Sequence, residues 1–279
     1  MSETLVIGGD LRVKRLGYGA MRLSGAGIWG DPPDRDAAVR LLRRAVELGI
    51  DFIDTADAYG PDTNERLIAD ALYPYPPGLV IATKGGIVRP SPDRWERDAR
   101  PVHLREACEA SLARLRVERI DLYLLHAIDP RVPLEESLGE LARLQQAGKI
   151  RHVGVSNFTS GELERARRVV NVVSVQNRYN VADRYSDSVL AACERDGLVF
   201  IPWSPLSQNP REAGEGARVR LEDWASRKGV SLAQASVAWL LARSPAMLPI
   251  PGTANLGHLE ENCGAATLRL TPEEMTAIG

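Results

Sequence analysis

Residues 49–67 read GIDFIDTADAYGPDTNERL, and this stretch decides the class of fold. It opens with a short apolar run that ends at Asp54, and Tyr59 follows five positions later. The segment DTNERL then predicts the start of a helix, because Asp62 is a capping residue with Glu65 three positions further on. The stretch is therefore typical of a strand, a polar loop and a helix, in that order.

The same order repeats along the chain. Most of the strand-like runs are continuously apolar, as in parallel strands that are covered on both faces. Residues 34–49 place apolar side chains on one helical face and stop at Gly49, while Thr159 and Ser231 each begin a helix with Glu or Gln three positions on. The strand-like runs end near Ala20, Asp54, Lys84, His126, Ser156, Gln176, Trp203 and Pro251. Eight strands that alternate with helices predict an α/β fold, the (β/α)8 TIM barrel.

An N-terminal β-hairpin is expected to plug the bottom of this barrel, since TLVI and LRVKR flank the turn Gly8-Gly9-Asp10. A doubly wound open sheet is the structural alternative, because it also alternates strands and helices. Its nucleotide-binding form carries GxGxxG after the first strand, and RLGYGAM at residues 15–21 lacks the full motif. We therefore expect a single barrel domain over residues 1–279, with its active site in the loops at the C-terminal face.

Composition excludes several classes of protein. The net charge of −2 gives no reason to expect nucleic acid or an anionic membrane as a partner. No apolar run reaches the ~18 residues of a spanning helix, and no signal peptide is recognisable. Three widely spaced cysteines form neither a disulfide framework nor a metal cluster. We expect a reduced, cytoplasmic, metal-free protein, a monomer or a weak homo-oligomer.

Four titratable side chains follow three consecutive strands: Asp54, Tyr59, Lys84 and His126. In a barrel these strand ends converge on one mouth. Taken singly, Asp54 could cap a turn, Tyr59 could be a loop aromatic and His126 a core histidine. Lys84 is different, because an ammonium group at the end of an apolar strand needs a counter-charge or water. The four are therefore expected in one pocket.

Several motifs, in order, resemble those of the aldo-keto reductases. They are DTADAYG followed by NE, TK at 83–84, LLH at 124–126, GVSNF at 154–158, VQNRYN at 175–180, WSPLS at 203–207 and IPGTANLGHLEEN at 250–262. The resemblance covers nearly the whole chain. Within the family, residues 15–43 and ALYPY at 71–75 look like a bacterial subgroup that includes pyridoxal reductases.

The resemblance implies NAD(P)H-dependent reduction of an aldehyde or ketone, with Asp54, Tyr59, Lys84 and His126 as the catalytic residues. Tyr59 would protonate the carbonyl oxygen while the nicotinamide delivers hydride. A free phenol titrates near ~10. We expect Lys84, about 4 Å away at an effective dielectric of about 20, to stabilise the phenolate by roughly 4 kcal/mol, partly offset by Asp54. His126 would be neutral and would orient the carbonyl.

The implied cofactor is NADP(H), with NAD(H) as the alternative. Ser156, Asn157 and Gln176 match positions that hold the carboxamide, and Trp203 matches the aromatic side chain that stacks on the nicotinamide. The other matched cofactor positions are Ser204, Leu206, Gly252, Thr253, His258, Glu261 and Asn262. The best-known members have basic residues at the positions of Gly252 and His258, where they bind the 2′-phosphate, so the preference between the two cofactors stays open.

Three long loops, residues 21–33, 85–100 and 204–218, are expected to shape the substrate pocket. Met21, Trp29 and Trp95 are the candidate substrate contacts. The middle loop also carries four arginines, which favour recruitment of an anionic substrate and a merely solvated loop equally: Arg89, Arg94, Arg97 and Arg100.

Two other functions are weighed against the reductase. Lys84 could be the Schiff-base nucleophile of an aldolase-like barrel, which needs a neutral lysine and is disfavoured by Asp54 on the adjoining strand. The chain could instead bind the dinucleotide as a redox-sensing or regulatory subunit with little turnover, as the family's potassium-channel partners do. For the reductase, pyridoxal is a candidate substrate from the subgroup resemblance alone.

Overall fold

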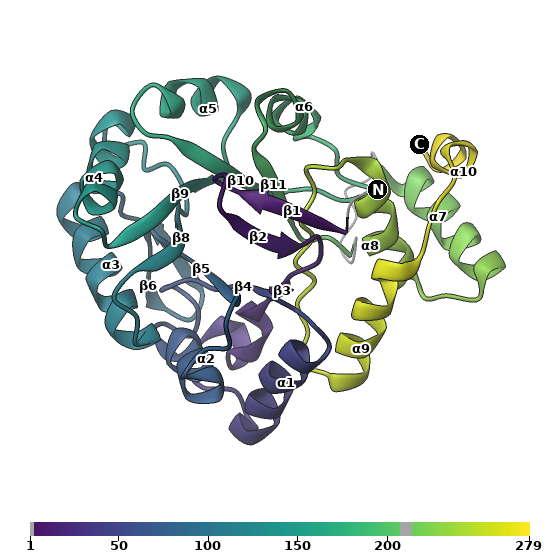
Figure 1. Cartoon of the computed structure of the whole chain (residues 1–279), viewed down its shortest axis with the longest axis horizontal. Helices are drawn as coiled ribbons and strands as arrows, with labels where there is room; N and C mark the ends of the chain where they lie inside the picture. Colours follow the sequence, from purple (N-terminus) through teal and green to yellow (C-terminus); the bar gives the residue numbers. More distant parts are fainter. Residues whose placement is uncertain (1–2, 207–213) are drawn as a thin grey trace.

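The computed structural model describes residues 3–206 and 214–279. Over these residues, seven parallel strands form one curled sheet in the order β11-β10-β9-β8-β5-β4-β3. The strands are β3 (Tyr18–Gly19), β4 (Phe52–Asp54), β5 (Val80–Gly85), β8 (Ile120–Leu125), β9 (Ile150–Ser156), β10 (Val172–Arg178) and β11 (Val199–Trp203). Helices surround the sheet, as Figure 1 shows, so the predicted TIM barrel is confirmed.

The surrounding helices follow the strands in chain order (Figure 1). They are α1 (Arg35–Glu47), α2 (Thr63–Leu72), α3 (Pro101–Leu115), α4 (Leu134–Gln146), α5 (Ser160–Arg167), α6 (Asp187–Asp196), α7 (Glu215–Lys228), α8 (Leu232–Arg243), α9 (Leu256–Gly264) and α10 (Pro272–Ile278). No helix of the described chain is both long and apolar enough to cross a bilayer.

The predicted eighth strand, ending at Pro251, is not a regular strand. The chain there runs beside β11, where Phe200 N donates to Ala246 O and Leu248 N donates to Phe200 O, both at 2.9 Å. On its other side, Gly17 N donates to Pro249 O at 2.9 Å. The segment thus closes the barrel, but its prolines have no N–H group with which to continue a ladder.

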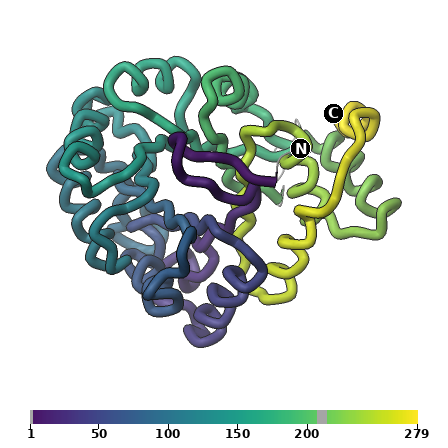
Figure 2. The backbone as a smooth tube through the Cα atoms, in the orientation of Figure 1, coloured from purple at the N-terminus to yellow at the C-terminus, as the bar shows by residue number. Residues whose placement is uncertain are grey.

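The N-terminal hairpin lies across one end of the barrel (Figure 2). Its strands β1 (Thr4–Ile7) and β2 (Leu11–Lys14) pair antiparallel, and Gly8 and Gly9 have φ of 62° and 90°. Ile7, Leu11 and Val13 are buried in one cluster with inward-facing strand residues such as Phe52 and Leu122. The predicted plug is therefore confirmed.

A capping box is present in two of the three places where the sequence predicted one. Thr159 and Ser231 each accept a hydrogen bond from the backbone of the third helical residue. In the third place α2 does begin directly after Asp62, as predicted, but the predicted cap is wrong, because Asp62 has a φ of 69° and its side chain does not cap the helix. Glu65 is buried instead, where it accepts hydrogen bonds from Thr83 and Arg114. Its carboxylate therefore ties α2 to β5 and α3.

The loops at the C-terminal face differ from simple coil. Residues 85–100 contain an antiparallel hairpin of β6 (Ile87–Ser91) and β7 (Arg94–Arg97), which the sequence reading did not predict. The first loop contains two 3-10 turns, η1 (Ala20–Leu23) and η2 (Ala26–Ile28). Of the third predicted loop, residues 207–213 lie outside the described part of the chain.

Candidate active site

Three neighbouring strands bring the four predicted catalytic side chains together. Asp54 ends β4, Lys84 lies near the end of β5, and His126 directly follows β8. The parallel register places Asp54 beside Ala82, and Lys84 beside Leu124. Tyr59 reaches the same place from the turn after β4. The convergence expected from the sequence is therefore present.

Lys84 is the centre of this cluster. Its ammonium nitrogen lies 2.7 Å from Asp54 Oδ2, 2.7 Å from the carbonyl oxygen of Thr55 and 3.4 Å from the Tyr59 hydroxyl oxygen. An ammonium group has three donors, so each finds one acceptor. The Lys84 side chain is fully buried, and Asp54 and Tyr59 are 3% and 7% exposed. The charges of the Lys84–Asp54 pair are thus shielded from bulk water.

The expected net lowering of the Tyr59 pKa is wrong. Burial raises the pKa of Tyr59, Lys84 lowers it and Asp54 raises it again, with a net shift above the ordinary value. The physical reason is that a buried phenolate loses its hydration, while the Lys84 charge is already shared with Asp54. The phenol therefore keeps its proton at neutral pH.

Lys84 and His126 have one defined charge state each. Burial lowers the pKa of Lys84, but Asp54 and Tyr59 more than offset this and the net pKa is raised. Burial and then Lys84 hold the pKa of His126 well below its ordinary value, so this imidazole is neutral, as expected. The His126 ring meets the Tyr59 ring edge-on, with centroids 5.9 Å apart. A charged Lys84 disfavours the Schiff-base alternative.

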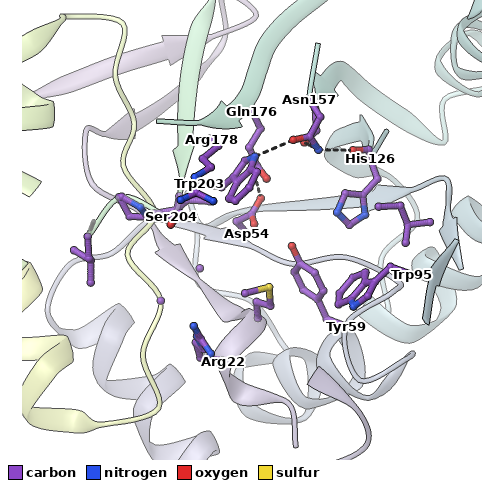
Figure 3. A pocket seen from close by; sticks show the side chains of 18 residues that line it. Arg22, Asp54, Tyr59, Trp95, His126, Asn157, Gln176, Arg178, Trp203 and Ser204 are labelled. Atoms are coloured by element: carbon purple, nitrogen blue, oxygen red, sulfur yellow. Dashed lines mark hydrogen bonds between the residues drawn. The ribbon is translucent and has the colours of Figure 1, made fainter. Parts of the chain in front are cut away.

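Three of the four predicted catalytic side chains, Asp54, Tyr59 and His126, line a cavity of about 500 Å³ (Figure 3), whereas the fully buried Lys84 lies behind them and does not line it. Predicted residues that line it are Met21, Asp54, Tyr59, Trp95, His126, Ser156, Asn157, Gln176, Trp203, Ser204, Leu206 and Gly252. Lining residues that the sequence reading missed are Gly19, Arg22, Ile87, Arg178, Pro205 and Ile250. In Figure 3, Tyr59 and Trp95 lie on one side of the cavity, and Arg178 and Trp203 on the other.

The predicted carboxamide-binding residues hold one another in place. Asn157 Nδ2 donates to His126 O and Ser156 Oγ, both at 3.1 Å. Trp203 Nε1 in turn donates to Asn157 Oδ1 at 3.0 Å. Gln176 Nε2 donates to Asp54 Oδ1 at 2.7 Å, a contact that no sequence signal indicated. Through Asn157, the Trp203 indole is connected to the backbone of His126.

Arg178, which the sequence reading also missed, lies over Trp203. Its guanidinium carbon is 5.6 Å from the centre of the Trp203 ring, and its Nε lies 2.8 Å from Asp183 Oδ2. The position directly after Gln176 and Asn177 at the end of β10 was the available signal, because strand ends in a barrel face the mouth. Arg178 therefore lies over the Trp203 ring, which is the ring predicted to stack on the nicotinamide.

Residues 252–262, which follow the segment that closes the barrel, include five of the predicted cofactor-binding positions. A Cβ at Gly252 would lie 2.6 Å from Gly19 O, so the two loops touch through glycine. Thr253 O accepts a hydrogen bond from Tyr18 at 2.6 Å. His258 is exposed, Glu261 is half-buried and Asn262 is buried with an Oδ1 that has no hydrogen-bond partner among the described residues. These three, with Thr253, do not line the cavity itself.

Trp29 is also outside the cavity lining, although the sequence reading made it a substrate contact. Its backbone pairs with Gly60 instead. Of the four loop arginines, Arg94 pairs with Glu96 and Arg100 with Asp98. Arg89 donates to backbone carbonyl groups. Three of the four guanidinium groups therefore have partners within the protein, although Arg94 and Arg100 form theirs at the exposed surface.

No group of three or more His, Cys, Asp or Glu side chains in the described residues is arranged to hold a metal ion. Asp54, Tyr59, Lys84 and His126 together form a tetrad. This tetrad can donate one proton, from Tyr59, next to the fixed positive charge of Lys84.

Comparison with known proteins gives a consistent result. Residues 15–279 match the model of the aldo/keto reductase family. The chain is 45% identical to an uncharacterised oxidoreductase of Schizosaccharomyces pombe, over 95% of this chain and 85% of that protein. It is 38% identical to pyridoxine 4-dehydrogenase of Escherichia coli, over 100% and 98% of the two chains.

A solved structure shares the fold and shows a cofactor. It is an aldo-keto reductase of Klebsiella pneumoniae in complex with NADPH, 26% identical, with a TM-score of 0.83 over 100% of this chain and 94% of that one. The family uses a nicotinamide cofactor, and the barrel fold agrees with the family match. The chain belongs to the aldo/keto reductase family.

Proposed function

We propose that this protein reduces an aldehyde or ketone to an alcohol with NADPH, and that Tyr59 donates the proton. The observation that carries the proposal is the placement of Lys84 Nζ, 3.4 Å from the Tyr59 hydroxyl and 2.7 Å from Asp54, directly behind two side chains that line one cavity. Family membership and the NADPH complex of the Klebsiella relative support it.

The proton step follows from the direction of the hydrogen bonds. Lys84 donates to the Tyr59 oxygen, so the phenolic O–H is left to donate into the cavity. When that proton passes to a carbonyl oxygen, the phenolate forms beside the ammonium of Lys84, which stabilises it. Asp54 holds Lys84 in position, and neutral His126 can hydrogen-bond the carbonyl oxygen and orient it.

The cavity fits a nicotinamide dinucleotide, which supplies the hydride when it is bound. Trp203 presents an indole beside the tetrad, tied to Asn157 by its N–H group. The glycine contact between the loops at Gly19 and Gly252 leaves backbone rather than side chains at the rim. Outside the cavity lining, the Oδ1 of buried Asn262 has no hydrogen-bond partner among the described residues and is an acceptor that suits an adenine amino group.

Arg22 supports NADPH over NADH. It lines the cavity and is exposed, and its Cγ lies 3.7 Å from the position that a Cβ of Gly252 would take. A guanidinium from the first loop can therefore reach the region where other family members have a basic residue at the position of Gly252. Arginine matches the geometry of a phosphate group. Arg22→Ala is expected to raise the Kd for NADPH by about tenfold and to change the Kd for NADH much less.

Pyridoxal is the proposed substrate within the carbonyl class. The support is the 38% identity with the pyridoxine 4-dehydrogenase of Escherichia coli over the full length of both chains. Pyridoxal is a planar aromatic aldehyde, and the cavity wall near Tyr59 includes Trp95, Ile87 and Met21. An aromatic ring can pack against such a wall.

The test is NADPH consumption by the purified protein with a panel of pyridoxal, other aromatic aldehydes, aliphatic aldehydes and ketones. Carbonyl-dependent consumption, with the alcohol identified as product, supports the reductase. NADPH binding, seen as quenching of tryptophan fluorescence, without consumption for any member of the panel would favour the regulatory subunit instead. Pyridoxal that is reduced no faster than simple aldehydes would contradict the substrate assignment alone.

A further inference from the structure

Arg89 joins the two loops that border the substrate end of the cavity. It lies on β6, and its side chain reaches across to the loop after β3. There Nη1 donates to Ile28 O at 3.1 Å and Nη2 donates to Gly27 O at 2.9 Å. Nη2 also donates to Pro92 O in its own hairpin. The residue is only 7% exposed, so this guanidinium is an internal connector and not a surface charge.

Two indole rings lie close to the Arg89 guanidinium group. The Arg89 guanidinium carbon lies 3.7 Å from the centre of the Trp95 ring and 5.6 Å from the centre of the Trp29 ring. Trp95 lines the cavity, whereas Trp29 does not. Trp95 is also 42% exposed. The guanidinium group of Arg89 therefore packs against a ring that forms part of the cavity wall.

The same loop is fixed relative to Tyr59. Gly30 N donates to Gly60 O at 2.9 Å, and Gly60 N donates to Ile28 O at 3.2 Å. Thr63 Oγ1 also donates to Gly30 O at 3.0 Å. Gly60 directly follows Tyr59, the proposed proton donor. The loop whose carbonyl groups accept hydrogen bonds from Arg89 is therefore hydrogen-bonded to the turn that carries Tyr59. The position of Trp95 is thereby set against the position of Tyr59.

We propose that Arg89 is a positioning residue for substrate specificity: with its guanidinium group over the Trp95 ring and bonded to the loop after β3, it fixes Trp95 as the wall against which the ring of an aromatic carbonyl substrate packs. The proposal rests on the carbonyl reduction proposed above. A planar guanidinium both stacks on indole and serves several carbonyl oxygens in one plane, which lysine cannot do. A short aliphatic aldehyde at Tyr59 does not need this wall.

The test compares Arg89→Leu, Trp95→Ala and the double variant, with 4-nitrobenzaldehyde and propanal as substrates. Each single variant is expected to raise KM for the aromatic aldehyde by about fivefold to tenfold, with kcat and the KM for propanal changed less than about twofold. The double variant should match Trp95→Ala, because the two residues act through one wall. Arg94→Leu, on the same hairpin but exposed, is the matched control and should leave both KM values unchanged.

Additive effects in the double variant, or equal losses for the two aldehydes, would overturn the proposal. A second measurement keeps the test independent of turnover. The fluorescence of Trp95, taken as the difference between each protein and its Trp95→Phe counterpart, should be quenched more readily by acrylamide after Arg89→Leu. Unchanged quenching would show that Arg89 does not position Trp95, even if the wild-type protein reduced no carbonyl compound at all.

Discussion

Gln176 donates a hydrogen bond from Nε2 to Asp54 Oδ1 at 2.7 Å, although β10 and β4 are not neighbours in the sheet. The second oxygen of the same carboxylate accepts from Lys84 at 2.7 Å. Each Asp54 oxygen therefore has its own fixed donor, and both contacts are buried. Gln176 acts on the tetrad by holding Asp54 in the orientation that meets Lys84.

Gln176→Leu is expected to lower kcat by about tenfold to hundredfold, because Asp54 can then rotate away and misplace Lys84. Stability should fall by about 1–3 kcal/mol, since one buried carboxylate oxygen loses its donor. Steady-state kinetics and urea unfolding measure the two effects. Gln146→Leu, at an exposed position on α4, is the control and should change neither. Full activity in Gln176→Leu would show that Asp54 needs no second donor.

Lys84→Met should destabilise the protein by about 3–5 kcal/mol, because it leaves the Asp54 carboxylate buried without its cation. Adding Asp54→Asn removes that charge, so the double variant is expected to regain part of the loss while staying inactive. Urea unfolding of the wild type, both single variants and the double variant gives the coupling between the two residues. A double variant less stable than Lys84→Met would contradict a pair that is buried and mutually dependent.

His126 makes stability depend on pH with a defined sign. Burial holds its folded pKa well below the value of about 6.5 expected in the unfolded chain. The unfolded state therefore binds more protons below pH ~6.5, and stability falls as the pH drops through that value. His126 alone contributes at most about 1.4 kcal/mol per pH unit.

Urea unfolding at pH 7 and pH 5 checks this expectation. His126→Gln should lose less stability than the wild type over that interval, because glutamine does not titrate. His258→Gln, at an exposed position, should behave as the wild type does. An equal loss of stability in His126→Gln and the wild type would mean that another group causes the loss of stability between pH 7 and pH 5.

The convergence of the tetrad could be predicted from the sequence because it depends only on topology. In a parallel barrel every strand end reaches the same mouth, so Asp54, Lys84 and His126 had to meet once the strands were recognised. The contact of Gln176 with Asp54 depends instead on side-chain conformations across the barrel, which no local pattern records. The sign of the Tyr59 pKa shift was missed for a related reason, because the depth of burial is a property of the folded whole.

Local patterns failed where the backbone departs from its usual geometry. Asp62 has the sequence of a helix cap, but its φ of 69° turns the side chain away from that role. Residues 87–97 form a hairpin although they contain Pro90 and Pro92, which count against strands in a sequence pattern. Conversely, the eighth strand was predicted from an apolar run whose prolines prevent a regular ladder. That residues 1–279 form one domain stays a prediction.

The most direct measurement is the reduction of a carbonyl substrate by Tyr59→Phe, with NADPH affinity measured on the same protein by tryptophan fluorescence. The side chain keeps its ring and loses only the hydroxyl that Lys84 contacts at 3.4 Å. We expect kcat/KM to fall by about 10²–10⁴-fold while the Kd for NADPH stays within about twofold. Turnover within tenfold of the wild type would contradict Tyr59 as the proton donor.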